Sequence, residues 1–94
     1  MNITEVKVTV IENEMRLKAS ANIVFDDCFL VKGLKIISGS QGLFVAMPSR
    51  KLKNGRFQDI VHPLNAETRS MIEEKVISAY EEKLKDMVSS SEQQ

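Results

Sequence analysis

Residues 3–25 read ITEVKVTVIENEMRLKASANIVF, in which apolar and polar side chains alternate along two runs separated by a polar break. In the second run, every odd-numbered position from Met15 to Phe25 is apolar. Alternation with a period of two is typical of strands that bury one face and expose the other. The stretch therefore predicts two strands, joined by a short polar turn at Glu12-Asn13-Glu14.

The strand pattern continues after this stretch. Asp26-Asp27 predicts a second turn, and residues 28–38, CFLVKGLKIIS, predict a third strand in which the apolar phase switches at Lys32-Gly33. A bulge at Gly33 would return both halves of that strand to one face. Residues 43–47, Leu-Phe-Val-Ala-Met, show no alternation, which predicts a fourth strand buried on both faces, either in the centre of a sandwich or under a second subunit. The connections are too short for parallel crossovers, so the strands form an antiparallel meander.

A basic loop follows the fourth strand. Pro48 has no backbone donor, so we expect regular pairing to stop or shift there. Residues 50–56 hold four cations and contain a hairpin turn at Asn54-Gly55. After this turn, residues 57–61 can return as a short fifth strand.

The last third of the chain predicts a helix. Apolar residues recur every four positions from Ile72 to Val88, the spacing of an amphipathic helix that covers a sheet. Asn65 is the expected N-cap, and the helix is expected to end at about residue 88, before a polar, disordered tail at residues 89–94. The predicted fold is α+β: an antiparallel β-meander of four to five strands followed by one long C-terminal α-helix, in a single domain over residues 1–88.

Composition limits the class of protein. The 94 residues are 43% hydrophobic and 28% charged, as in ordinary globular domains, and charges at Glu5 and Lys7 argue against an export signal, so we expect a cytoplasmic protein without membrane contact. The only cysteine, Cys28, is interpreted as a small buried residue of the third strand. Net charge is zero, yet residues 1–56 hold nine basic and five acidic side chains, and residues 57–94 hold four and eight. The zero total argues against a protein that coats nucleic acid generally, and the asymmetry points to the basic half.

Patterns for catalysis and metal binding are weak. His62 follows Asp59 by three residues, but in an extended strand such residues point to opposite faces, and no serine or cysteine is fixed nearby as a nucleophile. His62 is therefore interpreted as a structural residue at a strand end. Because the sequence contains neither metal-ligand spacing nor a glycine-rich phosphate loop, it predicts no enzyme, no cofactor, no metal and no small-molecule substrate.

The basic loop is the strongest candidate site. Its cations, with no acid among them, are Arg50, Lys51, Lys53 and Arg56. Like charges repel unless they are solvated or face an anion, and the planar fork of arginine fits phosphate. The loop either contacts a nucleic acid or only maintains solubility. In a dimer, two loops would supply about eight cations, enough for strong and salt-sensitive binding.

A family resemblance adds to this interpretation. Residues 42–51, GLFVAMPSRK, together with GRFQDI at residues 55–60 and His62-Pro63, resemble the SpoVG family (stage V sporulation protein G, or septation protein). The resemblance covers about residues 1–84. It implies a bacterial cytoplasmic protein that forms a homodimer through its sheet and acts as a site-specific DNA- and RNA-binding regulator. In spore formers, the family is linked to septation and sporulation.

The resemblance also implies site residues. Nucleic-acid contacts of the family are attributed to the basic residues after Met-Pro-Ser and to the neighbouring helix, which correspond here to Arg50, Lys51, Lys53, Arg56 and Arg69. The expected dimer interface is the fourth strand: Leu43, Phe44, Val45, Ala46 and Met47. From side-chain geometry, we expect both loop arginines to contact base edges and both loop lysines to contact phosphates. The alternative is a protein-interaction module of the division or sporulation machinery that binds no nucleic acid.

Overall fold

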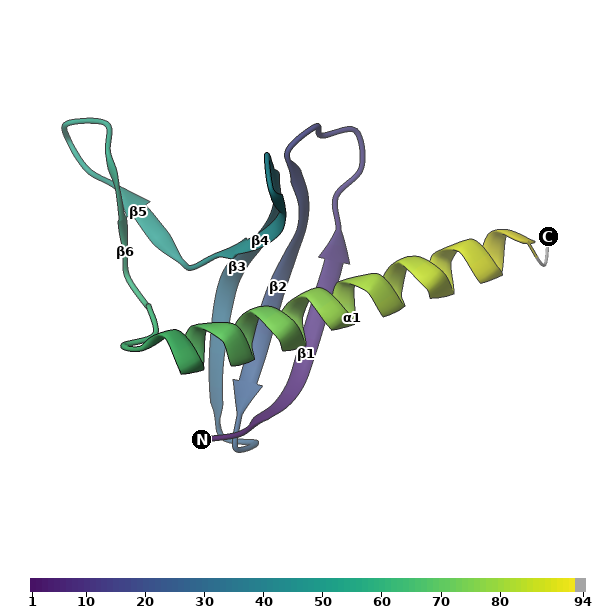
Figure 1. Cartoon of the computed structure of the whole chain (residues 1–94), viewed down its shortest axis with the longest axis horizontal. Helices are drawn as coiled ribbons and strands as arrows, with labels where there is room; N and C mark the ends of the chain where they lie inside the picture. The colour runs from purple at the N-terminus through teal and green to yellow at the C-terminus, as the bar shows by residue number, and fades with distance from the viewer. Residues whose placement is uncertain (93–94) are drawn as a thin grey trace.

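The four predicted strands form one antiparallel sheet. The computed structural model describes residues 1–92 and contains β1 (Ile3–Val10), β2 (Leu17–Phe25), β3 (Phe29–Gly39) and β4 (Gly42–Ala46), in the order β1-β2-β3-β4 (Figure 1). Each strand pairs with the next one along the chain. The meander prediction is confirmed, and β1 and β4 are the two edges of the sheet.

Two further strands form a separate hairpin. β5 (Ser49–Lys51) and β6 (Phe57–Asp59) pair with each other in a second, two-stranded sheet, and they project from the meander (Figure 1). We call residues 49–59 the arm. The predicted fifth strand is thus β6, with β5 rather than the meander as its partner. Pro48 separates the two sheets because it has no N–H to continue the β4 ladder.

The rest of the described chain is one helix, α1 (Ala66–Glu92). Asn65 is its N-cap, as predicted, because the Thr68 N–H donates to Asn65 Oδ1 at 2.7 Å. The helix extends four residues beyond the expected end at about residue 88, so residues 89–92 of the expected tail are helical. Residues 93–94 lie outside the described residues. None of the helical segments described is long and apolar enough to cross a membrane.

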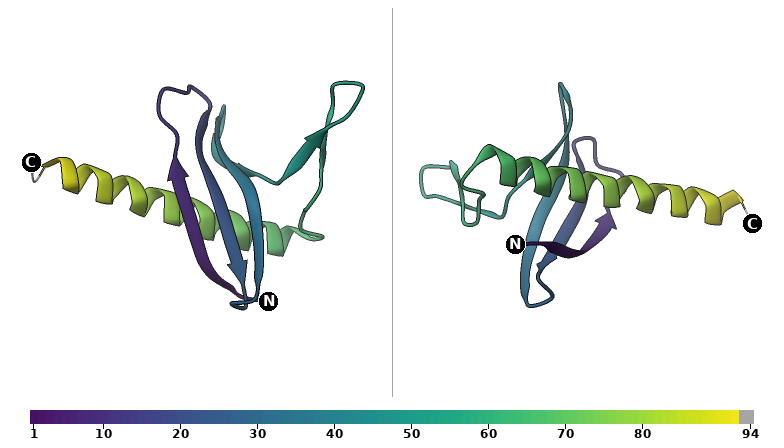
Figure 2. Two further views of the ribbon diagram at one scale, coloured as in Figure 1. Left: turned by 180° about the vertical axis from the view of Figure 1, so that it is seen from behind. Right: turned by 60° about the horizontal axis from the view of Figure 1, so that its bottom comes forward.

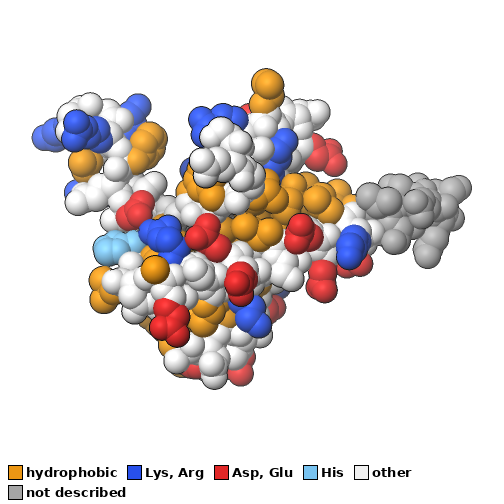
Figure 3. Space-filling view, in the orientation of Figure 1, with side chains coloured by type: hydrophobic (Ala, Val, Ile, Leu, Met, Phe, Trp, Pro, Cys, Tyr) orange, Lys and Arg blue, Asp and Glu red, His pale blue; other side chains and the backbone are white. Residues whose placement is uncertain are grey.

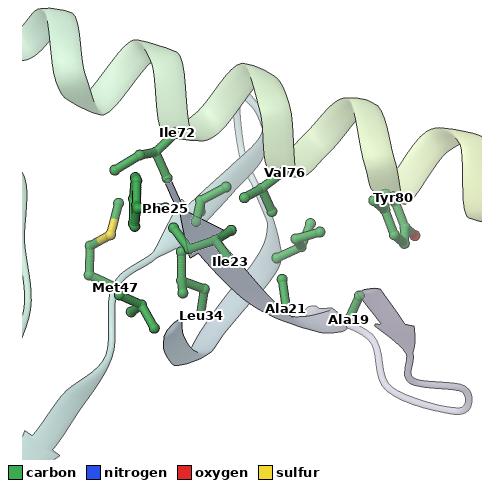
Figure 4. Close-up of a cluster of buried hydrophobic side chains, with 12 residues drawn as sticks. Ala19, Ala21, Ile23, Phe25, Leu34, Met47, Ile72, Val76 and Tyr80 are labelled. Atoms are coloured by element: carbon green, nitrogen blue, oxygen red, sulfur yellow. The ribbon is translucent and has the colours of Figure 1, made fainter. Parts of the chain in front are cut away.

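The hydrophobic core lies between α1 and the sheet face that this helix crosses (Figures 1 and 4). Alternate strand residues point into it, as the period-two pattern predicts. The buried members are Ala19, Ala21, Ile23, Phe25, Val31, Leu34, Ile36, Val45, Met47, Ile72, Val76 and Tyr80. Within the described chain, no element covers the opposite face of the sheet (Figure 2). The protein therefore has two layers and one open sheet face.

A bulge in β3 keeps its apolar residues on the core side. Val31 and Leu34 are both buried although they are three residues apart, because Lys32 and Gly33 together oppose the single residue Asn22. Gly33 has a φ of +88°, which favours glycine, and its N–H donates to Asn22 Oδ1 at 3.3 Å. The predicted bulge at Gly33 is confirmed.

The prediction for Cys28 is wrong. Its side chain is exposed and lies in the turn between β2 and β3. Because Phe25 pairs with Phe29, the turn takes three residues, and the Cys28 N–H donates to the Phe25 carbonyl at 3.0 Å. Asp26 and Asp27, with φ of 51° and 54°, make the reversal itself. Cys28 completes the turn instead of beginning the strand.

The fourth strand does not lie in the centre of a sandwich, and in the single chain only one of its faces is buried. Val45 and Met47 point into the core with 2% and 6% of their surface exposed, whereas Phe44, on the opposite face, is 39% exposed. β4 is an edge strand of a two-layer structure, and α1 covers only one of its faces. An apolar run without alternation therefore leaves part of its apolar surface in water.

Candidate nucleic-acid interface

The arm is anchored by backbone hydrogen bonds at its base. Ile60 donates its N–H to the Pro48 carbonyl at 2.7 Å, next to the pair formed by Ser49 and Asp59. Pro48 therefore cannot donate to the β4 ladder but accepts from the returning strand. This bond fixes where the arm leaves the two-layer body, only two residues after β4 ends at Ala46.

The tip of the arm is a tight turn. The Gly55 N–H donates to the Leu52 carbonyl at 3.0 Å, and the Leu52 N–H donates to the Arg56 carbonyl at 2.7 Å. Gly55 has a φ of +86°, and the Arg56 N–H donates to Asn54 Oδ1 at 2.9 Å. The turn lies where Asn54-Gly55 predicted it, as a three-residue loop over residues 53–55 with glycine in the left-handed position. These bonds hold Lys53 at the tip.

Strand alternation divides the arm into two faces. Arg50 pairs with Gln58, and two residues nearer the tip Leu52 bonds to Arg56, so these four side chains lie on one face. Lys51 pairs with Phe57 on the other face. The structure thus brings the two predicted arginines together with a glutamine and separates them from Lys51, which shares its face with an aromatic ring.

The arm is basic and open to solvent. All residues of β5 and β6 are exposed, as are Lys53 and Arg56. The only acid of residues 49–59 is Asp59, at the base. In Figure 3 the blue side chains of the arm gather at the upper left, apart from the red side chains over α1 and the sheet. Solvation relieves repulsion among the four cations here, and a bound polyanion would relieve it further.

Arg69 belongs to a different element from the other predicted site residues. It is exposed and lies in the first turn of α1, where its N–H donates to the Asn65 carbonyl at 3.2 Å. Residues 60–65 connect the arm to this turn (Figure 1). The positive end of the helix dipole and Arg69 therefore lie beyond the base of the arm rather than among the cations of its tip.

The predicted dimer residues do not share one surface. Val45 and Met47 are buried in the core of their own chain, and Leu43 is half-buried against it. Phe44 and Ala46 alternate with them and point to the open sheet face. Of the five residues, these two and the unpaired backbone edge of β4 are the parts that a second copy could reach.

His62 lies at the base of the arm, away from the predicted contacts. Its side chain is exposed, and Nδ1 lies 3.1 Å from the Pro63 carbonyl oxygen. It borders an apolar pocket of about 160 Å³, which Phe25, Met47 and Ile72 also line. In the part of the chain that the structure describes, no group of three or more His, Cys, Asp or Glu side chains is placed to hold a metal ion.

Fold and site define a class: a small two-layer α+β protein with a projecting basic arm. The family profile of SpoVG matches residues 1–82. The chain belongs to the SpoVG family, which confirms the resemblance inferred from the sequence.

Curated relatives agree with this assignment, and those named here are all called "Putative septation protein SpoVG". The protein of Bdellovibrio bacteriovorus is 59% identical over 87 residues, which cover 93% of this chain and 80% of the relative. That of Phytoplasma australiense is 47% identical over 94 residues, covering 100% and 98%. That of Clostridioides difficile is 48% identical over 84 residues, covering 89% and 91%.

Proposed function

We propose that the chain is a homodimeric, site-specific regulator that binds DNA and RNA through its arm. The observation that carries the proposal is the arm itself: four cations on a hairpin that extends from the body into solvent. A two-stranded ribbon of this kind has the dimensions to enter a major groove. The proposed function is binding rather than catalysis, in the cytoplasm, and it needs no cofactor.

The two faces of the arm suggest a division of labour. Arg50 and Arg56 lie on the face that also carries Gln58. Arginine pairs with two acceptors of guanine, and glutamine with a donor and an acceptor of adenine, so this face suits base edges. Lys51 on the other face and Lys53 at the tip suit phosphates, which fix register without reading sequence.

Dimerisation would place two arms at a fixed distance. β4 has an unpaired edge, and Phe44, which is 39% exposed, lies beside it. Pairing of two β4 edges would satisfy these backbone groups and would place the two Phe44 rings side by side, with the open sheet face left uncovered. Because β5 begins three residues after β4 ends, both arms would leave the body close to this seam.

The test removes the four arm cations together. In R50A/K51A/K53A/R56A, we expect affinity for duplex DNA to fall and the slope of log K against log salt to become shallower by about three to four per protomer. Titration across about 50 to 200 mM salt measures both. The control is K75A/K83A/K85A, which removes exposed lysines from α1. If the arm variant remains a folded dimer and keeps its affinity and slope, the assignment of the arm is wrong.

A second candidate function rests on another observation. Residues 57–64 expose four apolar side chains, led by Leu64 at 90% and Phe57 at 71%, with Ile60 and Val61 between them. Several exposed apolar side chains within eight residues are a feature of protein-interaction surfaces. The word septation in the relatives' names fits a partner in the division machinery, or in the sporulation machinery of spore formers. A pull-down that survives nuclease, with no DNA or RNA shift at low salt, would favour this module.

A further inference from the structure

The open face of the sheet has a chemistry of its own. Its side chains are those that alternate with the core residues, and the view from behind in Figure 2 shows the sheet in front of α1. They are Glu5, Lys7, Thr9, Lys18, Ser20, Asn22, Val24, Leu30, Lys32, Lys35, Ile37, Phe44 and Ala46, of which Lys18 is half-buried. Polar and basic residues occupy the middle, and the larger apolar ones lie toward the ends of the strands.

Three exposed lysines lie in two adjacent rows across this face. Lys7 opposes Asn22, and the β3 bulge places Lys32 opposite the same Asn22 from the other side. In the next row, Lys35 lies between Ser20 and the β4 residue Ala46. Strands are about 4.8 Å apart and alternate residues about 6.8 Å apart, so the backbone sites of neighbouring lysines in this set are separated by about 7 to 10 Å.

Acids are placed around the lysines rather than among them. Glu5 is the only acid with a side chain on the open face, one row away from Lys7. The turns at the two ends of the meander are acidic, with Glu12 and Glu14 at one end and Asp26 and Asp27 at the other. A polyanion along the strands would meet these carboxylates, whereas one that crosses the strands would meet only the lysines. The favourable path therefore runs from β1 to β4, the strand that leads into the arm.

Side chains along the same path across the strands could also contact the bases of a nucleic acid. Asn22, Ser20 and Thr9 supply polar side chains between the lysines. At the β4 end, Phe44 lies over Gly39, where an added Cβ would come within 3.0 Å of the ring. An exposed ring on an open sheet can stack on an unpaired base. A base inside a duplex is already stacked between its neighbours and cannot reach the ring.

We propose that the open sheet face is a second nucleic-acid site, which binds a single strand laid across the meander toward the arm. The lysines hold phosphates and Phe44 stacks on a base at the β4 edge. This inference extends the proposed function: the sheet face would bind single-stranded nucleic acid, and the arm would bind duplex DNA. It does not require the arm assignment to be correct.

The experiment compares two variants with equal loss of charge. K7Q/K32Q/K35Q neutralises the sheet face, and K75Q/K83Q/K85Q neutralises three exposed lysines of α1. Fluorescence anisotropy measures binding of an unstructured single-stranded RNA of about 20 nucleotides, of DNA with the same sequence, and of its duplex, across about 50 to 200 mM salt. Circular dichroism confirms that each variant is folded.

For the sheet variant, we expect affinity for both single strands to fall about tenfold or more at the lowest salt, and the salt slope to become shallower by about two per protomer. Duplex affinity changes by less than about twofold, and so does single-strand affinity in the helix variant. Equal single-strand affinity in the two variants, or no single-strand binding by the unaltered protein at low salt, overturns the proposal. The arm variant R50A/K51A/K53A/R56A tests the two sites independently. If this variant binds duplex DNA as well as the unaltered protein does, the arm assignment is wrong, whereas the proposal for the sheet face is unaffected.

Discussion

At the scale of residues, the arm poses the question of what each cation does. Arg50 and Arg56 lie on one face with Gln58, and Lys51 lies on the other. Arginine can donate two hydrogen bonds to one base edge, whereas an ammonium group acts as a point charge. The two faces of the arm therefore differ in the kind of contact they can make: the arginine face suits base edges, and the lysine face suits phosphates.

This difference predicts unlike effects of two double variants. R50A/R56A should lose discrimination between a selected duplex and a scrambled one, by about 1 to 3 kcal/mol for each base contact removed. K51A/K53A should weaken both duplexes alike and make the salt slope shallower by about two per protomer. Competition binding of the two duplexes at several salt concentrations distinguishes these results. If the lysine pair changes discrimination and the arginine pair does not, the roles of the two faces are reversed.

Elements differ in how far the sequence determines them. The phase switch at Lys32-Gly33 was sufficient to predict the β3 bulge, and Asn65 predicted the helix start, because both signals are local. Burial of β4 was not predictable in this way, since it depends on how many layers pack on the sheet. Cys28 was misplaced because the number of residues in a turn depends on strand register.

The candidate site, too, could be predicted from the sequence only where its residues are close together along the chain. A run of cations marks the arm in the sequence, and the structure adds its two faces. The lysines of the open sheet face give no such signal, because Lys7, Lys32 and Lys35 are widely spaced and resemble ordinary solvated strand residues. Only the strand order, the bulge and the position of α1 bring them together on an uncovered surface.

The arm and the two-layer body should also differ in stability. Val45 is buried in the core, whereas Phe57 in β6 is 71% exposed and supports no layer. V45A should lower the free energy of unfolding by about 2 kcal/mol, and F57A by less than about 0.5 kcal/mol. Urea unfolding monitored by circular dichroism measures both. A large loss in F57A would show that the arm packs on the body in solution, contrary to its open position here.

At the scale of the whole molecule, charge is segregated by element. α1 carries four basic and seven acidic side chains, whereas β1 to β4 carry four lysines and one glutamate. The zero net charge predicts weak general affinity for nucleic acid, so the proposed binding would depend on presenting the basic surfaces together. Two copies joined at β4 would do this, with both arms beside the seam.

This arrangement predicts that loss of the dimer halves the number of arm cations that contact one duplex. F44D places a carboxylate at the exposed position beside the β4 edge, where two copies would repel each other and lose the contact between their rings. We expect it to be monomeric by analytical ultracentrifugation, with a duplex salt slope near −4 instead of about −7 for the eight arm cations of a dimer. T9D is the matched control, because it adds the same charge to the open face on β1, at the opposite edge, and should remain dimeric. A dimeric F44D protein with the full slope would place the interface elsewhere than β4.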